Sequence, residues 1–303
     1  MRKALITLAL FFAGSAAQAA EVEHELGVTD VPANPERIVV LEFSFIDALA
    51  SVGVAPVGIA DDERRERVIS AYTDVIGDDW VSVGTRRSPS LEVIASLQPD
   101  LIIADLRRHG EAYETFSQIA PTIVLDSLAG DYHDSVAQMS VIGEAIGRAD
   151  EMAARVAEHQ ALMEDYAAQI RPLAEGLSAQ FGVTNADGLW LHSPVSYNGS
   201  LLAMFGFSST MEPDGEGGVY ETNYVPTSLE QLSAVNPDIL IFGEYADPSF
   251  VDGLAGDALY QDLTAVQAEH VFNVTAHNWS RLRGMLAAEL TAADVLEIMG
   301  QLE

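Results

Sequence analysis

A fourteen-residue segment occurs twice in this chain, at positions 90–103 and again at 228–241. Six of the fourteen residues are identical when the copies are aligned without gaps, and most of the others are like-for-like exchanges. Each copy begins with Ser-Leu-Glu, typical of a capped helix start, and passes through Pro-Asp into an aliphatic run typical of a buried strand. A unit of helix, turn and strand that occurs twice predicts two α/β lobes of similar construction.

One long helix is predicted between the two copies, over residues 150–171. Asp150 is a suitable N-cap, Pro172 is expected to end the helix, and apolar side chains recur at steps of three and four. This stripe consists of Met152, Val156, His159, Met163, Tyr166 and Ile170. At ~1.5 Å per residue the helix is roughly 33 Å long, enough to lie along two small domains. It is expected to be the single connection between them and to leave little hinge freedom.

The predicted organisation is an N-terminal lobe over 20–149, the connecting helix over 150–171 and a C-terminal lobe over 172–303. Strands alternate with helices in both lobes, which predicts an α/β fold of two Rossmann-like lobes with mainly parallel sheets. Ligands of such sheets bind at the carboxyl ends of the strands. A ligand cleft is therefore expected between the lobes.

The N-terminal residues 1–19 are predicted to be a signal peptide. Arg2 and Lys3 precede an apolar run over 4–13, and small residues lead to a cleavage site after Ala19. This run is too short to cross a bilayer, which needs about 18 to 20 apolar residues. The chain has no cysteine, so neither a thiol-linked lipid anchor nor a disulfide is expected. These features predict an exported, unanchored periplasmic protein that is not inserted into the membrane.

The few basic residues are concentrated at predicted strand exits. Without the signal peptide the chain has 13 basic residues, all arginine, against 46 acidic ones, a balance that disfavours nucleic acid and anionic lipid as partners. Six arginines lie in or beside loops that follow strands: Arg86, Arg87, Arg107, Arg108, Arg281 and Arg283. Because the guanidinium fork matches carboxylates and phosphates, the sequence predicts an anion site to which both lobes contribute.

Several motifs together resemble the periplasmic iron(III) dicitrate-binding proteins, within the helix-linked, two-lobed solute-binding family of siderophore and vitamin B12 importers. The motifs occupy residues 35–49, 58–62, 83–86, 100–105, 108–109, 119–121 and 279–284. The resemblance covers nearly the whole chain after the signal peptide and is weakest over 205–224. It implies a monomeric binding protein that delivers its ligand to an inner-membrane ABC permease.

The resemblance also implies a ligand and its site. A ferric citrate complex is an anion rich in carboxylates, with its iron held by citrate rather than by protein, and no permanent cofactor or protein metal site is expected. Arg86, Arg108, Arg281 and Arg283 fall on matching positions of the family, whereas Arg87 and Arg107 are particular to this sequence. Trp279 and Tyr245 are expected to form walls of the cleft, with ordinary packing inside a lobe as the alternative for each.

Glu92 and Glu230 occupy equivalent places in the two repeated segments. In the resembled family a glutamate on each lobe docks onto arginines of the permease, and one such residue per lobe suits a two-fold partner. The alternative is structural, because a glutamate in the first turn of a helix stabilises that turn.

Other function classes are open at this stage. Direct zinc or manganese binding would need a cluster such as His109, His192 and His277 with a carboxylate, and vitamin B12 or haem would suit the same fold. An enzyme is disfavoured because the chain lacks the G-x-S-x-G, H-E-x-x-H and P-loop motifs and a cysteine nucleophile. A calcium loop over 214–218 lacks EF-hand spacing.

Overall fold

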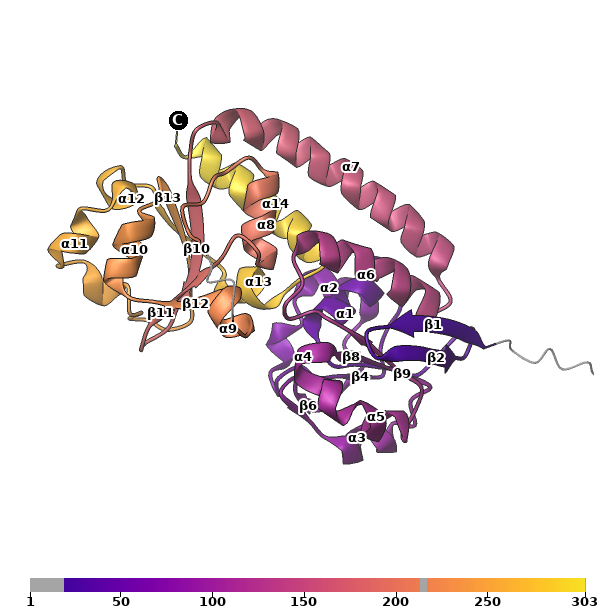
Figure 1. Cartoon of the computed structure of the whole chain (residues 1–303). Coiled ribbons are helices and arrows are strands. Elements are labelled where there is room, and N and C mark those ends of the chain that lie inside the picture. Colours follow the sequence, from indigo (N-terminus) through magenta and orange to yellow (C-terminus); the bar gives the residue numbers. More distant parts are fainter. Residues whose placement is uncertain (1–18, 213–216, 303) are drawn as a thin grey trace, which may run out of the picture.

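The computed structural model describes residues 19–212 and 217–302. Two α/β lobes lie side by side, and helix α7 (Ala149–Ala174) runs along both of them (Figure 1). The predicted two-lobed fold is therefore confirmed. The predicted signal peptide, apart from Ala19, and most of the 214–218 loop lie outside the described residues.

The first lobe is built on a five-stranded parallel sheet in the order β5-β4-β3-β8-β9. Its strands are β3 (Ile38–Val40), β4 (Gly58–Ile59), β5 (Val81–Ser82), β8 (Leu101–Asp105) and β9 (Thr122–Leu125). The helices are α1 (Phe43–Ser51), α2 (Ser70–Ile76), α3 (Leu91–Ser96), α4 (Leu106–His109), α5 (Tyr113–Ser117) and α6 (Tyr132–Ala145), with 3₁₀ turns at Arg65–Arg67 and Gly110–Ala112. Alternate strand residues such as Val39 and Val40 pack into different cores, so both faces of the sheet are covered.

Two small hairpins of the first lobe are absent from the sequence prediction. Strands β1 (Ala20–His24) and β2 (Gly27–Val31) pair antiparallel and lie against β9 and α6. Strands β6 (Gly84–Thr85) and β7 (Ser88–Pro89) form the second hairpin, whose turn carries Arg86 and Arg87.

The second lobe contains a mixed sheet in the order β12-β11-β10-β13-β14. Its strands are β10 (Ala179–Thr184), β11 (Leu189–His192), β12 (Tyr224–Thr227), β13 (Ile239–Glu244) and β14 (Val271–Val274). A tight turn at 185–188 joins β10 to β11 in an antiparallel hairpin, and β11 also pairs antiparallel with β12. The helices are α8 (Tyr197–Met204), α9 (Val219–Thr222), α10 (Leu229–Val235), α11 (Ala258–Gln261), α12 (Thr264–Gln267), α13 (Ala276–Arg281) and α14 (Met285–Gly300), with a 3₁₀ turn at Asp252–Leu254.

The sequence repeat forms equivalent elements in the two lobes. Ser90 caps α3 by accepting a hydrogen bond from Val93 N, and Ser228 caps α10 by accepting one from Gln231 N. Each helix then leads into an interior strand of its sheet, β8 or β13. The predicted unit of capped helix, turn and buried strand is therefore confirmed in both copies.

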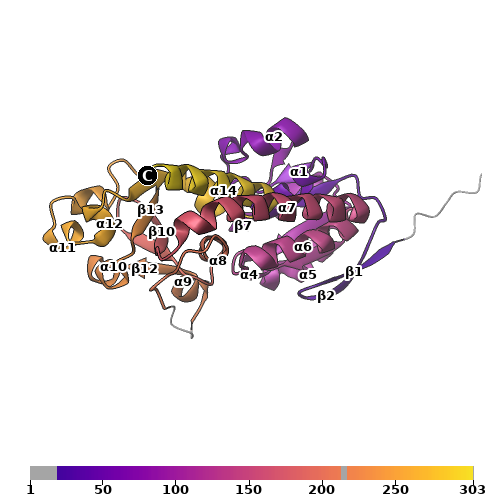
Figure 2. The same ribbon diagram turned by 90° about the horizontal axis from the view of Figure 1, so that it is seen from above.

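Two predictions about the connection between the lobes are wrong. Helix α7 continues past Pro172 to Ala174, because a proline in the last turn removes one N–H donor where few residues of the helix remain. Helix α14 forms a second connection: Met285 and Ala287 lie in the core of the first lobe, whereas Val295 and Ile298 lie in the core of the second. Seen from above, α7 and α14 lie next to each other across the two lobes (Figure 2).

A buried polar cluster joins these two helices to α6. His159 of α7 is fully buried, with Nε2 2.9 Å from Tyr132 Oη and Nδ1 2.8 Å from Glu289 Oε1 of α14. Arg155 also donates to that Glu289 oxygen, at 2.6 Å. The predicted burial of His159 is confirmed, and its two ring nitrogens link three helices.

The start of α14 is capped by a side chain of the first lobe. Gly284 occupies the N-cap position and has no side chain to accept a hydrogen bond. Instead, Asp47 of α1 accepts from Leu286 N at 3.2 Å and from Ala287 N at 2.9 Å. Tyr72 donates to the same carboxyl group at 2.9 Å. A fully buried acid in the first lobe thus satisfies the free N–H groups of a helix whose other end lies in the second.

The pKa of Asp47 predicts a specific pH dependence of stability. Burial raises this pKa from 3.8 to about 7, and the hydrogen bonds from the α14 backbone and Tyr72 offset only part of the rise. Between about pH 4 and 7 the folded protein therefore holds a proton that the unfolded chain has lost. The contribution of this group to the free energy of unfolding then falls as the pH rises.

We expect Asp47→Asn to remove this pH dependence. The difference in unfolding free energy, wild type minus variant, should fall by on the order of 4 kcal/mol from pH 4 to 7, since one pKa unit is about 1.4 kcal/mol. Urea unfolding across this range measures it. Parallel curves for the two proteins would contradict the raised pKa.

Candidate ligand-binding site

A cleft of about 600 Å³ lies between the lobes, within the size range of small-molecule sites. The first lobe contributes the loop after β4, the β6–β7 turn, α4 and the segment after β9. The second contributes β10, β11, α9, β12 and the segment after β13, together with the end of α13 and the residues that follow it. The lining residues are Asp62, Arg67, Thr85, Arg86, Arg87, Arg108, Leu128, Val183, Asn185, Trp190, His192, Tyr220, Tyr224, Tyr245, Ser280, Arg281 and Arg283. This arrangement agrees with the prediction that the ligand site lies at the carboxyl ends of the strands.

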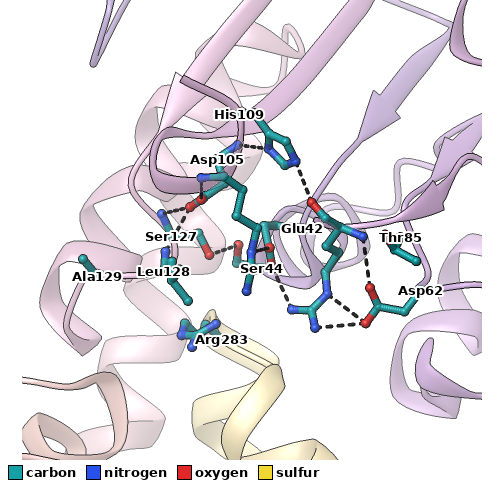
Figure 3. Close-up of polar contacts among 12 residues, drawn as sticks. Glu42, Ser44, Asp62, Thr85, Asp105, His109, Ser127, Leu128, Ala129 and Arg283 are labelled. Carbon is teal, nitrogen blue, oxygen red and sulfur yellow. Dashed lines mark hydrogen bonds and ion pairs between the residues drawn. The ribbon is translucent and has the colours of Figure 1, made fainter. Parts of the chain in front are cut away.

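Glu42 lies beneath the arginines of the first lobe and is almost fully buried (Figure 3). Its Oε2 accepts from Arg86 Nη1 at 3.1 Å, and its Oε1 lies 2.5 Å from Arg108 Nε. Burial opposes ionisation of Glu42, but the charges of Arg86, Arg108 and Arg283 outweigh it and hold its pKa below the usual range. Glu42 therefore acts as a fixed counter-ion at the base of the cleft.

Asp62 holds the same arginine from the side of the cleft. It accepts from the Arg86 backbone N at 3.0 Å and from Nε and Nη2 at 3.1 and 3.0 Å, and also from Arg67 Nη1 at 2.6 Å. Asp62 and the following Glu63 both have left-handed backbone conformations, with φ of 61° and 58°. Such strain is typical of loops that are held in place by their surroundings. The guanidinium group of Arg86 is thus fixed by two carboxylates.

Asp105 and His109 connect this network to the start of α4 (Figure 3). Asp105 accepts from Arg108 N at 2.8 Å and from the backbone of Ser127 and Leu128 at 2.9 and 3.0 Å. His109 Nδ1 accepts from Asp105 N at 3.0 Å, so Nε2 carries the proton and donates to the Arg86 carbonyl at 2.7 Å. Burial lowers the pKa of His109, which favours this neutral state. These contacts position the two arginines, and both nitrogens of His109 are occupied.

The arginines contributed by the C-terminal part of the chain have aromatic partners. The Arg281 guanidinium lies 4.1 Å from the ring centroid of Tyr245, and Arg283 Nη2 donates to Tyr224 Oη at 2.7 Å. Arg283 is buried, whereas Arg281 is partly exposed. Among the described residues, no carboxylate lies within 4.0 Å of Arg281, Arg283 or the exposed Arg87. Within this part of the chain, no carboxylate therefore competes with an anion for their donors.

The charge balance of the cleft is strongly positive. Six arginines line it: Arg67, Arg86, Arg87, Arg108, Arg281 and Arg283. Within the described part of the chain, the carboxylates that form ion pairs with these arginines are Asp62 in the wall and Glu42 beneath it. Six positive charges against two negative ones leave an excess of about four. This excess occurs in a chain whose formal net charge is −31.

Two predicted site residues lie elsewhere. Trp279 is 1% exposed and packs in the core of the second lobe, 5.0 Å from the Phe181 ring, with its indole N–H donating to Asp294 at 2.8 Å. Arg107 pairs with Asp126 at 2.8 Å and lines a separate groove of about 700 Å³ beside the β1–β2 hairpin. The prediction that they line the cleft is wrong for both, because a position near a strand exit does not determine the direction of the side chain. For Trp279 the alternative of ordinary packing inside a lobe holds.

The structure adds cleft residues that the sequence analysis did not select as anion ligands. Arg67 follows the exit of β4, so the strand-exit rule applied there would have found it. Trp190 takes the aromatic role predicted for Trp279, and Tyr224 lies at the end of the loop where the resemblance is weakest. No sequence signal identified Trp190 or Tyr224 as a cleft residue. The predicted Arg86, Arg87, Arg108, Arg281, Arg283 and Tyr245 do come together around the cleft.

The histidines proposed for direct metal binding do not meet. His109 bridges Asp105 and Arg86, whereas His277 Nε2 lies 2.7 Å from the Arg67 carbonyl. His192 lies beside Asn198, and burial together with the charge of Arg283 lowers its pKa to about 3. Over residues 19–212 and 217–302, no group of three or more His, Asp or Glu side chains is arranged to hold a metal ion.

Comparison with known proteins now decides the family. The sequence profile described as periplasmic binding protein matches residues 38–277. The chain belongs to this family. It is 40% identical over 284 residues to the Fe(3+) dicitrate-binding periplasmic protein FecB of Escherichia coli, covering 94% of this chain and 91% of FecB. It is 38% identical over 276 residues to the Fe(3+)-citrate-binding protein YfmC of Bacillus subtilis, covering 91% and 84%. The resemblance predicted from the sequence is confirmed.

Solved structures of more distant proteins share the fold of this periplasmic binding protein. Staphylococcus aureus SirA complexed with staphyloferrin B has a TM-score of 0.80 at 21% identity, covering 93% of this chain and 98% of that one. The petrobactin-binding protein YclQ of Bacillus subtilis has a TM-score of 0.75 at 24% identity, covering 93% and 99%. In the part of the chain that the structure describes, no helix has the length and apolar character of a membrane span.

We expect Glu42→Gln to destabilise the first lobe. The substitution leaves the largely buried Arg108 without its carboxylate partner and Arg86 with Asp62 alone. Breaking a buried ion pair typically costs about 3 to 5 kcal/mol. Asp126→Asn is the matched control, because it breaks the pair with Arg107, whose side chain is 52% exposed, and should cost at most ~1 kcal/mol. Urea unfolding measures both. Equal effects of the two substitutions would contradict the role of Glu42.

Proposed function

We propose that this periplasmic binding protein captures ferric citrate, or a closely related anionic carboxylate siderophore, and delivers it to an inner-membrane ABC permease. The observation that carries the proposal is the excess of arginine in the interlobe cleft of an acidic protein. The relatives named for Fe(3+)-citrate and Fe(3+) dicitrate binding support the choice of ligand. The protein binds and releases its ligand without turnover.

The chemistry of the cleft suits a complex that brings its own iron ligands. Carboxylates at the edge of a ferric citrate complex can accept the free N–H groups of Arg87, Arg281 and Arg283. Citrate already coordinates the iron, so the protein needs no cluster of metal-binding side chains of its own. Trp190 and Tyr245 offer flat faces with few rotatable bonds, which limits the entropy lost when a ligand is enclosed.

Docking to the permease involves Glu92 and Glu230 in this proposal. Each lies exposed in the first turn of its helix, α3 or α10, at equivalent positions of the repeated segment. Hydrogen bonds from the Glu230 backbone N–H and from Ser228 lower the pKa of Glu230, so it stays ionised. Two exposed anions of this kind can pair with basic residues on a two-fold permease. The protein acts as an exported, unanchored monomer.

Substitution of one free arginine tests the ligand. We expect Arg281→Gln to weaken ferric citrate binding roughly 10- to 150-fold, the equivalent of about 1.5 to 3 kcal/mol for a charge-assisted hydrogen bond. Arg107→Gln should change the affinity less than about twofold, because Arg107 lies outside the cleft. Isothermal titration calorimetry measures both. A wild-type protein that shows no saturable binding would refute the proposed ligand.

Fluorescence should report the position of the bound complex. Ferric citrate absorbs near-ultraviolet light, so we expect it to quench Trp190 in the cleft more than the buried Trp279. Trp190→Phe should remove most of the ligand-induced quenching while leaving the affinity measured by calorimetry within about tenfold. Quenching that persists unchanged in this variant would place the ligand elsewhere.

Docking is tested by a double variant. Glu92→Ala with Glu230→Ala should abolish ferric citrate uptake in cells that carry the cognate permease, while leaving ferric citrate affinity within about threefold, or ~0.65 kcal/mol. The matched control is Glu144→Ala with Glu158→Ala, two exposed acids on α6 and α7. Normal uptake in cells with the Glu92→Ala, Glu230→Ala variant would contradict docking and leave these residues only the role of stabilising helix starts.

A further inference from the structure

The loop that follows Arg281 and carries Arg283 is held by the first lobe, although it follows the second lobe in the sequence. Leu282 and Met285 are fully buried in the core that contains β3 and α1. Arg283 is close enough to Glu42 that each influences the pKa of the other. The position of Arg283 in the cleft therefore depends on how this loop packs onto the first lobe.

The carboxyl group of Asp47 lies directly against this loop. Its two oxygens accept from Leu286 N and Ala287 N, at 3.2 and 2.9 Å. Gly284 has a φ of 126°, and a Cβ atom added there would lie 2.4 Å from the Asp47 carboxyl group. A residue with a side chain could have capped α14 locally, but it would collide with Asp47. The cap is thus supplied by a side chain of another lobe, and glycine leaves room for it.

A side chain of the second lobe also contacts Gly284. Tyr197 of α8 donates to the Gly284 carbonyl at 2.7 Å and is itself buried. The next residue towards the cleft is Arg283, which donates to Tyr224, and Tyr224 donates to the Leu128 carbonyl at 3.0 Å. A continuous series of short contacts thus runs from Asp47 to an arginine of the cleft.

We infer that Asp47 is a positioning residue for ligand binding, which caps α14 across the lobe boundary and thereby holds Arg283 in the cleft. This inference rests on the proposed function. Arg283 is buried without a carboxylate within 4.0 Å in the described part of the chain, so ion pairing does not fix its place. A binding group has to be held to a fraction of an ångström by its supporting contacts, and the backbone of its loop supplies that support.

The competing explanation is that Asp47 only stabilises the fold. In that case its substitution would weaken binding through general loosening, whichever cleft arginine is present. If Asp47 acts through the loop, its effect on affinity should depend on Arg283 and not on Arg87, which lies in the β6–β7 turn of the first lobe. A double-mutant cycle separates the two explanations.

The cycle uses ferric citrate as the probe and calorimetry at pH 8 as the readout, on the full mature chain. At this pH Asp47 is largely ionised, so Asn, which resembles the protonated acid, removes one hydrogen-bond acceptor. We expect Asp47→Asn to weaken binding about tenfold. In the Arg283→Gln background it should add less than about twofold, whereas in the Arg87→Gln background the tenfold loss should persist. Equal losses in both backgrounds would overturn the inference and leave a purely structural role for Asp47.

A milder variant covers the case in which Asp47→Asn does not fold. Tyr197→Phe deletes one hydroxyl group that contacts the same loop from the second lobe. It should weaken binding about threefold, and again this effect should disappear in the Arg283→Gln background. Its persistence there would count against positioning by this loop.

A measurement without ligand separates failure of this inference from failure of the proposed function. Hydrogen exchange in the ligand-free protein should be at least tenfold faster at the amides of residues 283–287 in Asp47→Asn, and unchanged over 292–300 in the second-lobe part of α14. Unchanged exchange over 283–287 would overturn the inference even if ferric citrate proves not to be the ligand. Absence of saturable binding by the wild type would instead overturn the proposed function.

Discussion

Helix α14 belongs to the cores of both lobes, and the geometry of the cleft depends on this shared membership. Its first turn packs beside Asp47 and α1, whereas its later turns pack beside α7 and the second sheet. Together with α7 it gives two helical connections instead of one. The walls that the two lobes contribute to the cleft are therefore joined by two helices, a construction that favours a cleft formed before a ligand arrives.

The arginines of the cleft divide into two groups by their partners. Arg86 and Arg108 share the carboxyl group of Glu42, and Asp62 adds a second carboxylate to Arg86, so these side chains mainly shape the floor. Arg281 and Arg283 lie against tyrosines, which stabilise a cation without using up its charge. Within one site, Arg86 and Arg108 thus give the floor of the cleft its fixed shape, whereas Arg281 and Arg283 supply positive charge that a ligand can use.

The sequence was sufficient for the two lobes, the long helix and six of the cleft residues. Strand-exit positions such as Arg86 and Tyr245 follow from the alternation of strands and helices, which is a local pattern. Side-chain direction is not local, so Trp279 and Arg107 were misplaced. The dual packing of α14 depends on contacts between residues some 240 positions apart, such as Asp47 with Ala287, and no periodicity reveals these.

The protein carries a large negative net charge but a positive cleft, and this difference affects how an anionic ligand is captured. An anion that diffuses towards a protein of formal net charge −31 meets repulsion before it meets the arginines. At physiological ionic strength the Debye length is about 8 Å, so this repulsion fades within a few water layers of the surface. Inside the cleft, low-dielectric walls concentrate the field of the arginines. Added salt should therefore hasten the approach of the ligand while weakening its retention, the reverse of ordinary electrostatic steering.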